Sequence, residues 1–178
     1  MITENNLIYN NILSRTSVRI YKNREPLSDE QIEALLRAAM AAPSACNRQP
    51  WLFTVVTDTN LLDELAARLP YAKMLAHAPL AIIPCGDKNR FLEGDDTDLW
   101  IQDVSAASEN ILLAATALGL GAVWTSAFPH PDREAMIHDV LGMPDNLIPL
   151  CVIPIGVPAK EQEPRDKWNP DRIHYNKW

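Results

Sequence analysis

At 178 residues the chain has the usual size of one globular domain, and 47% hydrophobic residues are enough to bury a sizeable core. The net charge of −7 argues against a nucleic-acid-binding protein, because such a protein presents a basic face to the phosphates. No apolar run approaches the roughly 20 residues of a membrane-spanning helix, and the first residues are polar, unlike a secretory signal. We therefore expect a cytoplasmic protein without membrane or nucleic-acid partners.

The first helix is expected to begin near Thr3 and to end before Ser14, and residues 15–21 then form an extended or turning segment. Ser28 opens a second helix, with Gln31 at the reciprocal capping-box position. The helix ends ahead of the proline that follows it, because the residue before a proline is pushed out of the helical region. Its apolar residues recur at the spacing of one helical face: Ile32, Leu35, Leu36, Ala39 and Met40.

Two runs in the middle of the chain have the composition of strands. The first covers residues 51–57, after a polar loop, and Asp58 then caps a short helix. The second covers residues 79–85. Pro84 favours a strand end or a sheet edge within it, because proline cannot donate to the ladder.

The longest predicted helix covers residues 97–118 and follows a charged loop. From Ile111 onward it is apolar on nearly every face, which indicates burial on all sides. In a protein of this size, such burial favours a second subunit that covers the helix. Residues 122–126 then form a third strand, Pro131 stands at the first position of another helix, and residues 147–155 form a fourth strand.

The last segment, residues 156–178, contains three prolines and cannot form a long helix. Residues 173–176 alternate apolar and polar side chains as a strand does, so this arm is able to add to the sheet of a partner. The elements together predict one α+β domain over residues 1–178, with residues 156–178 as a C-terminal arm.

The charge is distributed unevenly along the chain. Residues 1–57 carry six basic and five acidic side chains, residues 58–145 carry five and fourteen, and residues 146–178 carry five and four. Both ends are therefore basic relative to an acidic middle. If the ends meet in the folded protein, they create a local site for an anion. Chance variation in composition along the chain, without any function, would give the same pattern.

Three residues near the N-terminus are candidates for such a site. In extended backbone Arg15, Ser17 and Arg19 point the same way. Two guanidinium groups that flank a hydroxyl would bind a phosphate well, because their planar donors match its oxygens. A solvated basic loop has the same composition.

A second candidate is the loop at residues 42–50, which is braced by two prolines. Its backbone and amide groups are able to donate hydrogen bonds to a flat polar ligand. An ordinary connection between a helix and a strand would have the same composition. We see no base near Cys46 that would activate it. The three cysteines form no Cys-x-x-Cys pair and the four histidines are scattered, so we expect neither disulfides nor a metal site.

Five blocks of sequence, in order, resemble the nitroreductase family and cover nearly the whole chain. They are Arg-x-Ser-x-Arg at 15–19, Ala-Pro-Ser with Asn-x-Gln-Pro-Trp at 42–51, Asp-Val-Ser-Ala-Ala-Ser-Glu-Asn at 103–110, Gly-Leu-Gly-Ala-Val-Trp at 119–124, and the tail with Arg-x-Lys at 165–167 and residues 173–178. Each block alone is weak evidence for the family, but the five blocks in this order are specific to it.

The resemblance implies a three-layer α/β/α fold with a mixed central sheet, in a homodimer whose C-terminal arms add to the partner subunit. It also implies FMN at the dimer interface, with NADH or NADPH as the electron donor. The cofactor-binding residues that it implies are Arg15, Thr16, Ser17, Arg19, Pro43, Ser44, Ala45, Asn47, Trp124, Thr125, Arg165 and Lys167.

The basic residues of this set are expected at the two ends of the cofactor. By resemblance, Arg15 and Ser17 hold the phosphate and ribityl chain, and Arg19 approaches the pyrimidine side of the flavin ring. Arg165 and Lys167 close on the phosphate. The usual tail of the family has Lys-x-Arg, and this chain reverses the pair, which puts in doubt which residue makes the bidentate contact.

The uncharged residues of the set are expected around the flavin ring. By resemblance, Pro43, Ser44 and Asn47 come from the other subunit, and backbone groups near Trp124 and Thr125 lie beside the reactive edge of the flavin. No catalytic side chain is expected, because the flavin carries the hydride. Neither the role of Cys46 nor the residues that line the acceptor pocket follow from the resemblance.

The activity implied by the resemblance is the transfer of two electrons from NAD(P)H to nitroaromatic, quinone or similar small acceptors, in a ping-pong mechanism. Flavin reduction, dehalogenation and ene-type reduction are alternatives on the same fold. A flavin-binding storage or sensor protein without turnover is an alternative of another class. The sequence indicates neither the physiological substrate nor a preference between NADH and NADPH.

Overall fold

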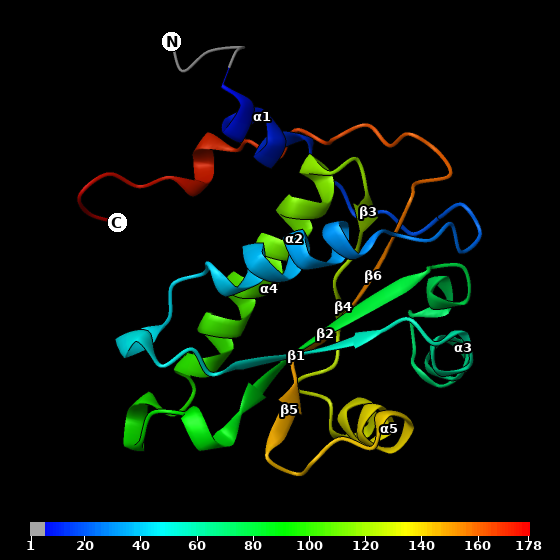
Figure 1. Ribbon diagram of the computed structural model, residues 1–178. Coiled ribbons are helices and arrows are strands. Elements are labelled where there is room, and N and C mark those ends of the chain that lie inside the picture. Colours follow the sequence, from blue (N-terminus) through cyan, green and yellow to red (C-terminus); the bar gives the residue numbers. More distant parts are fainter. Residues whose placement is uncertain (1–5) are drawn as a thin grey trace.

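A six-stranded sheet occupies the centre of the protein in the computed structural model, which describes residues 6–178 (Figure 1). The strands are β1 (Trp51–Val56), β2 (Leu80–Asp87), β3 (Gly121–Ala122), β4 (Thr125–Ser126), β5 (Leu147–Pro149) and β6 (Cys151–Gly156). They follow the order β1-β2-β6-β3, with β5 on β2 and β4 on β6, and these strands pair antiparallel. The mixed character that we expected is limited, over residues 6–178, to a parallel bridge between Ser17 and Ala122.

Helices cover both faces of this sheet, which gives the three layers (Figure 1). One face carries α2 (Asp29–Met40) and α4 (Leu99–Ala117), and the other carries α3 (Thr59–Arg68) and α5 (Pro131–Leu141). The capping box predicted at Ser28 and Gln31 is present at the start of α2. A further helix, α1 (Leu7–Ser14), packs on α4, while the predicted helix start at Thr3 lies outside the described residues.

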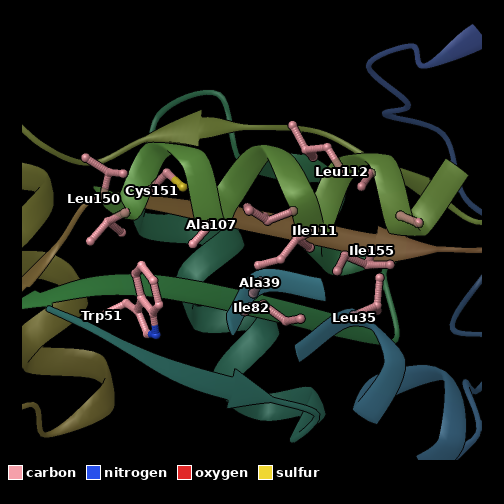
Figure 2. Close-up of a cluster of buried hydrophobic side chains, with 14 of the residues drawn as sticks. Leu35, Ala39, Trp51, Ile82, Ala107, Ile111, Leu112, Leu150, Cys151 and Ile155 are labelled. Carbon is pink, nitrogen blue, oxygen red and sulfur yellow. The ribbon is translucent and has the colours of Figure 1, made fainter. Parts of the chain in front are cut away.

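Alternating residues of β2 build two hydrophobic cores, one on each face of the sheet. Leu80 and Ile82 belong to the core under α2 and α4, whereas Ala81 and Ile83 belong to the core under α3 and α5. Figure 2 shows the first of these cores, in which side chains of α2 and α4 gather near Ile82: Leu35, Ala39, Ala107 and Ile111.

Pro84 lies inside a central strand, so the prediction of a strand end or a sheet edge at this residue was wrong. β6 pairs with residues 80–82 of β2 and β5 pairs with residues 85–87, and the register shifts by one residue between the two ladders. The extra residue is Leu150, whose N–H donates to the Pro84 carbonyl at 2.9 Å. This bulge interrupts the ladder beside the proline, where a donor is missing, and it divides the predicted strand 147–155 in two.

The apolar end of α4 is only partly covered within one chain. Ile111 and Leu112 are buried, but Leu118 is 39% exposed. No residue of α1 is buried, and Ile8 is 76% exposed. We refer to this exposed region as the α1 apolar surface, and its residues are Leu7, Ile8, Ile12, Leu13 and Leu118. The all-round burial predicted from Ile111 onward is therefore incomplete in the single chain.

The arm begins as a partner of the N-terminal segment and then follows the outside of the protein near α1 (Figure 1). A short turn at Pro170–Arg172 precedes residues 173–176, which form no strand in the single chain. The alternation in that segment could form a strand only on another sheet, because the chain's own sheet does not pair with it. Among the helices formed by residues 6–178, none has the length and apolar character needed to cross a membrane.

Candidate functional site

The two basic ends of the chain meet at a cavity of about 360 Å³. One part of its lining comes from residues 15–19 and the other from the arm: Arg15, Thr16, Ser17, Arg19, Gln162, Glu163, Arg165 and Lys167. Four cationic side chains and two hydroxyl groups thus line the cavity, together with one carboxylate. This donor set fits a phosphate, because guanidinium groups and hydroxyls match its oxygens in geometry and charge.

Buried residues hold the N-terminal segment in place. The Val18 N–H donates to the carbonyl of Ala122 in β3 at 3.0 Å. The hydroxyl of Tyr21 lies 2.8 Å from the Val18 carbonyl and 3.0 Å from the Pro154 carbonyl. Burial raises the pKa of Tyr21, so the phenol stays protonated and donates. Because alternate side chains of extended backbone point to opposite sides, the burial of Val18 turns Ser17 and Arg19 towards the cavity.

Gly121 permits the close approach between this segment and β3. A Cβ atom at this position would lie 2.6 Å from the Cβ of Val18, which is shorter than any normal contact. We expect Gly121→Ala to lower the free energy of unfolding by about 1–3 kcal/mol, because either the strand or the segment must shift. Urea unfolding monitored by tryptophan fluorescence measures this change. An unchanged midpoint would contradict the contact.

Two residues of the cavity lining and one residue in contact with Arg15 were not identified from the sequence. Gln162 and Glu163 belong to the lining, and Glu109 of α4 lies 3.5 Å from the Nε of Arg15. The sequence marks the first two only as part of a polar arm. Glu109 stands within the block at residues 103–110, but the block gives it no role.

The loop after α2 is held by its own side chains and by α4. The Ser44 hydroxyl accepts from the Gln49 N–H, and the Ala45 N–H donates to Oδ1 of Asp103, each at 2.9 Å. The side chain of Gln49 donates to Asn47. Asp103 is buried on α4, so the loop is anchored to a core helix. The exposed Cys46 has a positive φ of 50° within this loop.

This loop lies away from the cavity. None of its predicted site residues, namely Pro43, Ser44, Ala45 and Asn47, belongs to the cavity lining. The loop contacts the N-terminal part of α4 at Asp103, whereas Arg15 contacts Glu109 near the middle of the same helix. Figure 1 shows the loop and α1 towards opposite ends of α4.

Trp124 and Thr125 occupy a third position. The hydroxyl of Thr125 donates to the carbonyl of Val152 in β6 at 2.7 Å, and Trp124 packs against the core under α2 and α4. Neither residue lines the cavity. One chain therefore brings together six of the predicted residues and leaves the loop after α2 and the β3–β4 segment apart from them.

Residues 12–69 and 66–157 match the model of the nitroreductase family. The chain belongs to the nitroreductase family. A relative from Archaeoglobus fulgidus, named as an NADH dehydrogenase/NAD(P)H nitroreductase, is 44% identical over 170 residues, or 94% of this chain and 96% of the relative. A crystal structure under the same name, from Parabacteroides distasonis, is 46% identical with a TM-score of 0.91, over 97% and 99% of the two chains.

A third similar protein is a nitroreductase from Desulfovibrio desulfuricans, whose crystal structure is a complex with FMN. It is 30% identical, with a TM-score of 0.81 over 99% of both chains. These comparisons confirm the resemblance, the α+β fold and the expectation of an oxidoreductase.

The donors of the cavity suit the phosphate group that a nitroreductase with FMN would need to hold. The cations come from two segments that the fold brings together, and hydroxyls stand among them. Over residues 6–178, no three His, Cys, Asp or Glu side chains are placed to hold a metal ion. The role of each lining residue in cofactor binding stays a prediction.

Proposed function

We propose that this NAD(P)H-dependent oxidoreductase binds FMN by its phosphate in the basic cavity and reduces small acceptors such as nitroaromatics or quinones. The observation that carries the proposal is the convergence of Arg15, Arg19, Arg165 and Lys167 on one cavity of an otherwise acidic chain. The FMN complex of the Desulfovibrio desulfuricans protein supports the choice of cofactor.

The residues of the cavity would hold the cofactor and set its position. Arg15, Arg165 and Lys167 would neutralise the phosphate, and the hydroxyl of Ser17 would donate to it. Arg19, further along the extended segment, would face the pyrimidine side of the ring. When bound, the flavin supplies the redox chemistry, accepting a hydride and passing two electrons to the acceptor.

The proposed active form is a cytoplasmic homodimer. The α1 apolar surface is exposed in the single chain, and a second copy would cover it. The loop after α2, which does not line the cavity of its own chain, would then contribute to the flavin site of the partner subunit. The arm would add to the partner in the same assembly, with residues 173–176 as its strand.

Ping-pong kinetics are expected, because NAD(P)H and the acceptor would use the same face of one flavin in turn. Double-reciprocal plots of the initial rate against the NADH or NADPH concentration, at several fixed quinone concentrations, should give parallel lines. Intersecting lines would require both substrates to bind at once. A flavin that NAD(P)H reduces but no acceptor reoxidises would indicate a protein without turnover and would contradict the proposed activity.

A further inference from the structure

Arg15 depends on α4 for its position. The residue follows α1, none of whose residues is buried, so burial does little to fix this helix. Two polar contacts attach the end of α1 to α4. The Asn11 side chain donates to the Leu113 carbonyl at 3.0 Å, and the Arg15 Nε lies 3.5 Å from Oε1 of Glu109. Because α4 is a core helix, Glu109 provides Arg15 with a fixed point of attachment.

Glu109 contacts Arg15 without lining the basic cavity. Arg15, like Arg165 and Lys167, lines both this cavity and a second one, of about 840 Å³, between α1 and the arm. Glu109 lines the second cavity and is not part of the lining of the first. The Arg15 side chain is only 17% exposed, whereas that of Glu109 is 48% exposed. Because the carboxylate contacts Nε, the donors on Nη1 and Nη2 stay available for a ligand.

We infer that Glu109 is a positioning residue, which orients the guanidinium of Arg15 so that its two amino groups face the phosphate of FMN. The inference rests on the proposed function, because it concerns the same cavity. A planar guanidinium that is held along one edge loses less freedom when its other edge binds an oxyanion. Glu109 does not need to touch the ligand to have this effect.

Two substitutions separate orientation from charge. Glu109→Gln keeps an oxygen able to lie beside the Nε of Arg15 but removes the negative charge, whereas Glu109→Ala removes both. We expect the alanine variant to raise the Kd for FMN by about threefold to tenfold, the scale of one modest polar contact. The glutamine variant should stay within about twofold of the original protein. Riboflavin, which lacks the phosphate, should bind equally well to all three.

The Kd values follow from quenching of flavin fluorescence with the full-length protein freed of flavin. In an Arg15→Gln background the alanine substitution should have no further effect, because its target is gone. If both Glu109 variants bind FMN more tightly, Glu109 acts only by repelling the phosphate and the inference is wrong. If Glu109→Ala weakens FMN and riboflavin equally, the role is structural and the inference is again wrong.

The same titration distinguishes failure of the inference from failure of the proposed function. An original protein that binds FMN no more tightly than riboflavin has no phosphate site in this cavity, which contradicts both. An original protein that prefers FMN, with a Glu109→Ala variant that retains the full preference, contradicts the positioning role alone.

Discussion

Replacing Arg15 and Arg165 together with glutamine is expected to weaken FMN binding by roughly a hundredfold to ten-thousandfold. Each guanidinium that bonds to an anion contributes about 1.5–3 kcal/mol, and about 1.4 kcal/mol corresponds to tenfold in affinity. Both residues line the cavity, one from each basic end of the chain. The two effects need not be additive, because both side chains would bind the same phosphate.

The matched control for this variant is Arg37→Gln with Arg172→Gln. Both control residues are exposed arginines, one on α2 and one in the arm, and neither lines the cavity. Isothermal titration with FMN should show the large loss only in the Arg15 and Arg165 variant, and riboflavin binding should change little in either. If FMN affinity falls by less than about threefold in the Arg15 and Arg165 variant, the cavity is not the phosphate site.

A charge on the α1 apolar surface is expected to dissociate the dimer. Ile8→Glu should leave the single chain nearly as stable as before, because Ile8 is exposed and surface changes rarely exceed about 0.5 kcal/mol. Within an interface, an unpaired charge costs several kcal/mol, so dimer affinity should fall by a hundredfold or more. FMN binding should weaken in parallel, because the loop from the partner subunit would be lost.

Tyr71→Glu provides the control for this second prediction. Tyr71 is also an exposed large side chain, but it lies after α3, on the other face of the sheet from α4. Analytical ultracentrifugation over a range of concentrations should show a dimer for the original protein and for Tyr71→Glu, and mainly monomer for Ile8→Glu. A flavin-loaded monomer of the original protein would contradict the proposed assembly.

Local signals predicted the fold well, and the failures share a non-local cause. The capping box at Ser28 and Gln31 involves residues three apart, so the sequence shows it directly. Pro84 was misplaced because the bulge that accommodates it is at Leu150, on another strand. The alternation at residues 173–176 has no strand to pair with in the single chain, so the predicted strand on a partner's sheet stays a prediction.

The candidate site was predictable where charge or sequence blocks marked it. The basic ends pointed to an anion cavity, and Arg15, Ser17 and Arg165 do line one. The contact between Arg15 and Glu109 was not predictable, because it joins residues far apart in sequence and depends on how α1 crosses α4. Gln162 lines the cavity because of the path that the arm follows, and the sequence has no periodic signal for that path.

The absorbance spectrum of the purified protein tests the central claim most directly. If FMN binds in the basic cavity, the protein should be yellow, with the bands of an oxidised flavin and about one FMN per chain. Denaturation should release the flavin, and it should be identified as FMN rather than riboflavin or FAD, because the four cations of the cavity suit a terminal phosphate. A colourless protein that also fails to take up added FMN would contradict the account.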